Sequence, residues 1–220
     1  MADIDLVEIN KYFGSHNGFG EYKQVAHDLL KRVTEVLDEN KINYFLISGT
    51  LLGYIRHNDF IPWDDDIDLI VDNSIFDKLD ALIEKYKDLS FITRDGYIVK
   101  TSFRDVGKKL DGFEHYKIRD DEVYKFPFVD LFIYNCHDDQ INFFRKEWNL
   151  NKFFPPQEVV FNGYKVKIPN NPHYFLFNNY GNTYDKLVVS SGFSHKEEKK
   201  IEKKLALPMK LYIESKEFLT

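Results

Sequence analysis

The stretch Ile61-Pro-Trp-Asp-Asp-Asp-Ile-Asp-Leu-Ile-Val71 places a cluster of aspartates at the head of an apolar run. Its alternation predicts a strand over residues 67–71. Side chains two residues apart on a strand share a face and lie roughly 6.5–7 Å apart. Asp66 and Asp68 are therefore expected to point the same way, while Ile67 points into the core.

Two carboxylates on one face repel each other unless a cation or a proton lies between them. Hard oxygen ligands favour Mg²⁺, or Mn²⁺, particularly where substrate phosphates complete the coordination shell. Asp66 and Asp68 are thus candidate metal ligands, with Asp64 as a further one. A solvated acidic loop without a ligand is the alternative.

Asp130 supplies a second argument, because it lies inside the apolar run Phe126-Pro-Phe-Val-Asp-Leu-Phe-Ile-Tyr134. A charge in such a strand is costly without a partner. A metal shared with Asp66 and Asp68 would be one partner. The alternative is a buried lysine, arginine or set of backbone amides.

A third element precedes the acidic cluster, in Ser48-Gly-Thr-Leu-Leu-Gly53 followed by Arg56. Gly49 breaks an apolar strand and allows close approach of a ligand to the backbone. A helix that begins there would present N–H groups to a phosphate, and Arg56 would clamp phosphate with two hydrogen bonds. A plain turn and a surface arginine remain the alternatives.

The remaining pattern predicts the fold class. Helices are expected over 21–40, 74–87, 171–180 and 195–215, with one or two helical turns over 50–56. Strands are expected over 44–48, 67–71 and 128–134, with two or three more between 90 and 119, an excursion over 137–158 and a hairpin over 159–168 around Asn162-Gly163. This order predicts an α/β to α+β fold, a mixed β-sheet flanked by helices with a C-terminal β-hairpin and helical additions.

Length and composition predict one domain over residues 21–220 after an N-terminal arm over 1–20. The chain has 220 residues, of which 43% are hydrophobic and 30% charged, so intrinsic disorder is excluded. A net charge of −6 argues against bulk nucleic acid as a partner. The single cysteine, Cys136, fits a reducing compartment. No apolar run is long enough for a transmembrane segment, and no signal peptide is recognised, so a cytoplasmic location is expected.

Together, Gly49-Thr-Leu-Leu-Gly53, Arg56-His57 and Ile61-Pro-Trp-Asp-Asp-Asp-Ile-Asp68 resemble the signature of the LicD family. This family includes bacterial phosphocholine transferases and is related to fukutin and fukutin-related protein. The likeness continues downstream and covers about Tyr44 to Tyr184. The later landmarks are Phe128-Val-Asp-Leu-Phe132, Phe154-Pro155, Val160-Phe-Asn-Gly-Tyr-Lys-Val-Lys-Ile-Pro169 and Tyr180-Gly181.

The resemblance implies a nucleotidyltransferase-type fold and a single LicD-like domain over 21–220. In this fold a Gly-Ser/Thr turn and a strand with paired aspartates bind metal and nucleotide phosphates. Members of the family transfer a phospho-alcohol, such as phosphocholine or a polyol phosphate, from a CDP-linked donor to a glycan hydroxyl. The implied partners are a CDP-linked donor or other nucleotide, and a glycan or lipid-linked sugar acceptor.

The resemblance also implies roles for individual residues. Mg²⁺ (or Mn²⁺) would be held by Asp66, Asp68 and Asp130, and Asp130 is favoured to take the acceptor proton. Asp64 is an alternative base or a ligand to a second metal. The expected phosphate-binding residues are Gly49, Thr50, Arg56 and His57, of which Arg56 would also offset charge in the transition state; a structural role is the alternative for His57. Lys117 and Arg119 are further candidates because they would share a face of a predicted strand, with a solvated strand face as the alternative.

Two other functions remain open at this point. A true nucleotidyltransferase would use the same metal site and load a nucleotide from an NTP onto a sugar or a phospho-alcohol. A non-catalytic nucleotide-binding protein would keep the fold and bind without turnover. The sequence leaves the donor alcohol, the acceptor and the number of metal ions undetermined.

Overall fold

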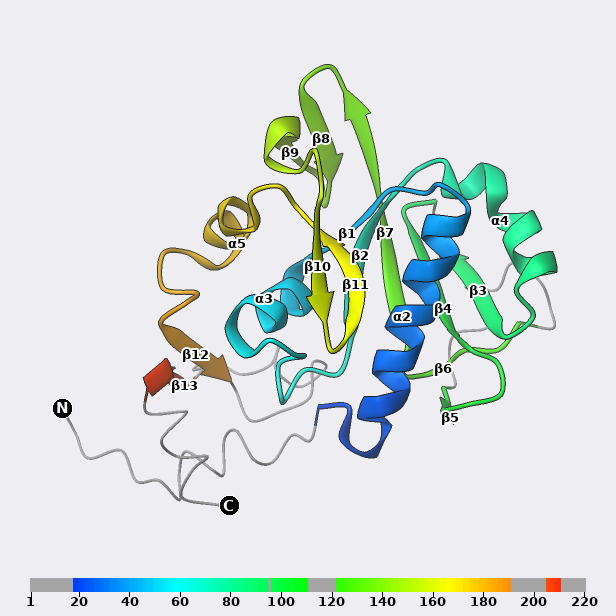
Figure 1. Ribbon diagram of the computed structural model, residues 1–220, viewed down its shortest axis with the longest axis horizontal. Helices are drawn as coiled ribbons and strands as arrows, with labels where there is room; N and C mark the ends of the chain where they lie inside the picture. The colour runs from blue at the N-terminus through cyan, green and yellow to red at the C-terminus, as the bar shows by residue number, and fades with distance from the viewer. Residues whose placement is uncertain (1–17, 95, 111–121, 191–204, 211–220) are drawn as a thin grey trace.

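The computed structural model describes residues 18–94, 96–110, 122–190 and 205–210. Its centre is a mixed sheet with the strand order β1-β2-β7-β4-β3 (Figure 1). The strands are β1 (Tyr44–Leu46), β2 (Ile67–Asp72), β3 (Leu89–Arg94), β4 (Ile98–Phe103) and β7 (Val129–His137). Within this order β2 and β7 run parallel and the other neighbours are antiparallel, which confirms the mixed sheet expected from the sequence.

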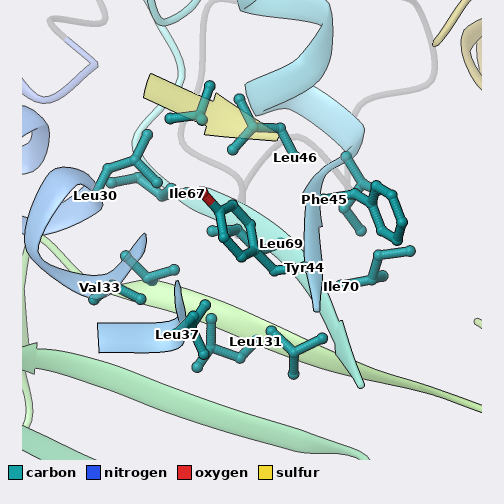
Figure 2. Packing of buried hydrophobic residues seen from close by; sticks show 14 of the residues in the cluster. Leu30, Val33, Leu37, Tyr44, Phe45, Leu46, Ile67, Leu69, Ile70 and Leu131 are labelled. Atoms are coloured by element: carbon teal, nitrogen blue, oxygen red, sulfur yellow. The ribbon is translucent and has the colours of Figure 1, made fainter. Parts of the chain in front are cut away.

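Helix α2 (Lys23–Glu39) covers one face of this sheet (Figure 1). Its apolar residues recur at helical spacing, so they form one buried face. Figure 2 shows this packing from close by, with Leu30, Val33 and Leu37 of α2 facing Ile67, Leu69 and Leu131 of the two parallel strands. Helix α4 (Ile75–Lys85) follows β2 and contacts β3. Both helices confirm the sequence prediction.

Helix α3 (Ser48–His57) is longer than the one or two turns expected from the sequence. It begins directly after β1, at Ser48, so the strand ends earlier than predicted. Leu51 and Leu52 are buried and hold the helix against the core. The helix ends at Asn58, whose φ of 52° lies in the left-handed region that short polar side chains tolerate.

The predicted C-terminal additions are present. Strands β10 (Gln157–Phe161) and β11 (Tyr164–Ile168) form a hairpin around Asn162-Gly163, where both residues have positive φ, as a two-residue turn requires. Helix α5 (Pro172–Tyr180) follows, and the Asn171 side chain caps its start by accepting a hydrogen bond from the Tyr174 N–H at 3.0 Å.

The segment expected as an excursion over 137–158 contains further strands. Strands β8 (Gln140–Phe143) and β9 (Lys146–Asn149) form a hairpin that extends from β7. Phe143 and Trp148 are buried in the core. Phe144 follows Phe143 and interrupts the alternation of β8, and Trp148 is the one apolar residue of β9, so the sequence pattern does not predict the hairpin.

The helix expected over 195–215 is wrong over residues 205–208, whereas residues 209 and 210 are helical. Residues 205–208 form strand β13 (Leu205–Pro208), which pairs with β12 (Leu187–Ser190). The Lys/Glu run before residue 205 dominated the sequence pattern, whereas Leu205-Ala-Leu-Pro is apolar and ends in proline. Residues 191–204 and 211–220 lie outside the described residues. A last short pair joins β5 (Lys108–Lys109) and β6 (Lys125–Phe126).

The arm predicted over residues 1–20 differs from the structure at Phe19, which belongs to the core. Phe19 is 4% exposed and packs against Phe60 and Phe126, with ring centroids 4.9 and 5.9 Å away. Gly18, with φ of +50°, lies so close to the acidic loop that a Cβ would come within 2.6 Å of the Pro62 carbonyl oxygen. The described part of the chain therefore begins in the hydrophobic core. Residues 1–17 are outside the described residues.

The described helices include none that is both long and apolar enough to span a bilayer.

Replacing Phe19 with alanine should lower the free energy of unfolding by about 3–5 kcal/mol, because a buried aromatic ring leaves a cavity. Urea unfolding followed by circular dichroism measures the change. Phe177→Ala is the matched control, since Phe177 is 54% exposed and its loss should have little effect. Equal midpoints for the two variants would show that Phe19 is not part of the core.

Candidate active site

The acidic strand and the Gly-Thr turn lie together because β1 pairs with β2. The Ile47 N–H donates to the Asp68 carbonyl at 3.2 Å, and the Asp68 N–H donates to the Thr50 hydroxyl at 2.8 Å. Thr50 is 2% exposed, so its hydroxyl fixes the start of α3 to the start of β2. In this structure Thr50 positions Asp68, and its expected contact with phosphate stays a prediction.

Gly49 leaves the space that the Asp64 carboxylate occupies. A Cβ at residue 49 would lie 2.2 Å from Asp64 Oδ2. A side chain at this position would therefore displace Asp64. The expected closeness of the Gly-Thr turn and the acidic cluster is thus present.

Three charged residues lie side by side across the sheet. Asp68 of β2 is the register partner of Asp130 of β7, and Asp130 is the register partner of Lys100 of β4. Residues paired in this way project from the same face, and neighbouring strands are about 4.8 Å apart. Asp68, Asp130 and Lys100 therefore form a charged row on one face.

Lys100 is the partner of Asp130. Its Nζ lies 2.5 Å from Asp130 Oδ1 and 2.7 Å from Oδ2, and the two side chains are 13% and 11% exposed. Of the two partners considered from the sequence, the structure contains the buried lysine. Asp130 as a metal ligand stays a prediction.

The carboxylates perturb one another strongly. Burial, followed by the charges of Asp66, Asp130 and Asp64, raises the pKa of Asp68 well above its usual value. Burial raises the pKa of Asp130 to about 6, although Lys100 opposes the rise. Asp64, Asp66, Asp68 and Asp130 therefore form one electrostatic cluster, as the sequence predicted for their positions on two strands.

Tyr180, at the end of α5, faces this cluster. Burial, and then the charges of Asp68, Asp64 and Asp66, raise the pKa of its phenol, whereas Arg56 opposes the rise. The residue is nonetheless 43% exposed, so part of the ring is open to solvent. Tyr180 and Arg56 thus border the acidic cluster on its α5 side.

Arg56 also has a structural contact. Its Nη1 donates to the carbonyl oxygens of Tyr184 at 3.3 Å and Leu187 at 3.1 Å, which fastens the end of α3 to the segment before β12. Arg56 also acts electrostatically on the phenol of Tyr180, as the charges of the aspartates do. The expected phosphate contact of Arg56 stays a prediction.

His57 is neutral at neutral pH. Burial and the neighbouring Arg56 lower its pKa to about 4, and its ring packs edge-on against Trp63, with centroids 5.9 Å apart. A phosphate contact by His57 would therefore be a neutral hydrogen bond. Lys117 and Arg119, the other expected phosphate-binding residues, lie outside the described residues.

The donor set fits a hard divalent cation with an incomplete protein shell. Within the described residues no three histidine, cysteine, aspartate or glutamate side chains are arranged to hold a metal ion by themselves. Mg²⁺ is commonly bound through one or two carboxylates plus substrate phosphates and water. Burial and the neighbouring carboxylates raise the pKa of Asp68, and Lys100 opposes the rise, so a further cation would favour the ionised form. Asp66 and Asp68 therefore fit such a cation.

Two residues of this site were missed from the sequence. Lys100 stands alone in the apolar run Ile98-Val-Lys-Thr-Ser-Phe103, the same signal that pointed to Asp130. Tyr180 is a landmark of the family resemblance with no role predicted from the sequence, because no local pattern shows that its phenol comes close to the charges of Asp64, Asp66 and Asp68.

A family model described as LicD/FKTN/FKRP, nucleotidyltransferase domain, matches residues 41–171. The lipopolysaccharide cholinephosphotransferase LicD of Haemophilus influenzae is 32% identical over 123 residues, which cover 52% of this chain and 43% of LicD. Human ribitol 5-phosphate transferase FKRP is 51% identical over 46 residues, which cover 21% of this chain and 9% of FKRP.

Among solved structures, the lincosamide adenylyltransferase LnuA with bound lincomycin superposes with a TM-score of 0.44 and 13% identity, over 70% of this chain and 85% of LnuA. The chain spans less than half the length of the curated relatives it matches.

Replacing Lys100 with methionine should lower the free energy of unfolding by about 2–4 kcal/mol, because it leaves the Asp130 carboxylate buried without its partner. The double variant Lys100→Met/Asp130→Asn removes both charges and should recover most of the loss. Urea unfolding at pH 7 without metal measures both. Lys165→Met, at an exposed ion pair, is the control and should show no measurable change. A double variant as unstable as Lys100→Met would refute the pairing.

His57 should make stability depend on pH. Its pKa in the folded state is about 4, below the usual value of 6.5, so between these values the unfolded chain binds more protons. The free energy of unfolding should then fall as pH drops from about 6.5 to 4, by on the order of 2 kcal/mol. Unfolding of wild type and His57→Gln at pH 7 and pH 4 isolates this contribution. Identical pH dependence in the two proteins would contradict the lowered pKa.

Proposed function

Because the chain belongs to the LicD/FKTN/FKRP nucleotidyltransferase-domain family, we propose that it is a metal-dependent phosphotransferase. In this proposal it moves a phospho-alcohol, such as phosphocholine or a polyol phosphate, from a CDP-linked donor to a hydroxyl of a glycan or lipid-linked sugar. The transferase relatives from Haemophilus influenzae and human support the reaction class. The identities of the donor, the acceptor and the metal ion are part of our proposal.

The proposal rests on one observation, that the Gly-Thr turn and the acidic strand are in direct contact. Thr50 accepts a hydrogen bond from the backbone of Asp68, and Gly49 makes room for Asp64. The first turn of a helix and a pair of carboxylates thereby meet at one place. Helix N-termini attract phosphate, and paired carboxylates attract Mg²⁺. The place where the start of α3 meets the acidic strand therefore suits a metal-bound pyrophosphate.

Asp66 and Asp68 would hold the cation, with Asp64 and Asp130 beside them. When bound, Mg²⁺ (or Mn²⁺) would supply positive charge to the donor pyrophosphate and to the departing CMP. The backbone at Gly49 and Thr50 would orient the phosphates. Arg56 would add positive charge on the other side of the cluster.

In the reaction an acceptor hydroxyl oxygen attacks the phosphorus that carries the alcohol. The bond from that phosphorus to the CMP oxygen breaks, and CMP leaves with the bonding electrons. Asp130 is our candidate for the base that takes the proton of the acceptor hydroxyl. Its pKa of about 6 leaves the carboxylate ionised at neutral pH, yet lies near enough to the working pH for it to accept a proton. Lys100 holds its carboxylate in place.

The decisive experiment is ³¹P NMR of the purified protein with Mg²⁺ and a panel of CDP-alcohols together with candidate glycan acceptors. Appearance of CMP and of a new phosphodiester signal is the expected result. A parallel sample contains CTP and phospho-alcohols, and release of pyrophosphate there alone would identify a nucleotidyltransferase. Binding in both samples without any turnover would identify a non-catalytic nucleotide-binding protein.

Asp68→Asn should lose turnover by at least about 100-fold while the metal-free fold persists, because it removes a proposed ligand and relieves repulsion among buried carboxylates. Asp77→Asn, on the exposed side of α4, is the matched control and should retain full turnover. The same ³¹P assay and a thermal unfolding scan measure both properties. Undiminished turnover by the wild type in excess chelator would refute metal dependence.

A further inference from the structure

The geometry of the ion pair between Lys100 and Asp130 affects how many cations the site can bind. The Lys100 ammonium contacts both oxygens of the Asp130 carboxylate, at 2.5 and 2.7 Å. A cation chelated by one carboxylate takes the same position, since bidentate carboxylates bind it through both oxygens. Lys100 therefore occupies the place on Asp130 where a chelated cation would lie.

The ammonium is held firmly in that place. It lies over the ring of Phe128, 4.8 Å from the centroid, and 5.7 Å from the ring centroid of Tyr124. With 13% of its side chain exposed, Lys100 is largely withdrawn from water. Cation–π attraction and the carboxylate together replace the lost hydration. A metal ion would have to expel this buried charge to chelate Asp130.

The position next to Asp130 is also where two-metal chemistry would need a cation. Enzymes of that kind hold two ions about 3.5–4 Å apart between neighbouring carboxylates. Asp68 and Asp130 are neighbours on adjacent strands, and Lys100 is the next residue along the same row. Lys100 and one divalent cation together match the charges of Asp66, Asp68 and Asp130 when these are ionised, and Asp64 adds one further negative charge.

We propose that the Lys100 ammonium serves as a built-in substitute for a second metal ion, so that the chain binds a single divalent cation, on Asp66 and Asp68. The inference rests on the metal-binding part of the proposed function. Lys100 is thereby a positioning residue, because it orients Asp130 and excludes a second ion.

The test counts bound Mn²⁺ by electron paramagnetic resonance, since free Mn²⁺ gives the resolved signal as the full chain is titrated with the metal alone. Wild type should bind about one Mn²⁺, whereas Lys100→Met should bind about two, because Asp130 becomes available. The double variant Lys100→Met/Asp130→Asn should return to about one. Lys100→Arg keeps the charge and should also bind about one.

Two comparable Mn²⁺ ions on the wild type would overturn the inference, and so would an unchanged count in a folded Lys100→Met. Lys100→Gln provides the same comparison if the methionine variant does not fold. Turnover is not part of this readout. One bound Mn²⁺ without any transfer in the ³¹P assay would leave the inference standing and remove the proposed reaction, whereas a wild type that binds no Mn²⁺ would remove the inference.

Discussion

Repulsion among four carboxylates is the constraint around which this structure is organised. Burial and the charges of Asp66, Asp130 and Asp64 raise the pKa of Asp68 well above its usual value. A fold gains no stability from bringing four carboxylates this close together, because like charges repel and burial disfavours the charged form. The side chains are held together by the sheet, by the hydrogen bond between Thr50 at the start of α3 and the Asp68 backbone, and by the buried Lys100. This arrangement is typical of a site that is completed by a ligand.

The surrounding elements hold the cluster by short contacts to the backbone. Gly18 packs against carbonyl oxygens of the acidic loop, Gly49 against the Asp64 side chain, and Thr50 receives the Asp68 N–H. Each contact involves a small or fully buried residue, so the loop has little freedom to relax away from its own charge. Arg56 adds a tie between α3 and the segment before β12. The backbone of the acidic loop is thus held by contacts within the protein itself.

Local patterns predicted most of the fold, and contacts between distant strands account for what they missed. The two apolar faces of α2 and α4, the Asn162-Gly163 turn and the alternation at Asp66 and Asp68 all depend on residues close in sequence. Lys100 could be noticed as an odd charge, but its pairing with Asp130 depends on β4 lying next to β7, which no local pattern encodes. Phe19 has no apolar neighbours at regular spacing, and β13 follows a charged run that suggested a helix.

The parallel pairing of β2 with β7 has a consequence for synthesis of the chain. The ribosome delivers Asp66 and Asp68 first, Lys100 later, and Asp130 last of the four. Parallel strands close a long loop before they gain contacts, so this pairing forms slowly compared with the helices. Until β7 emerges from the ribosome, the nascent chain contains the acidic loop but lacks Asp130. Lys100 then has no register partner on β7, and the charged row is incomplete. A ribosome-bound fragment that ends within β4 therefore has the family's sequence signature without its site.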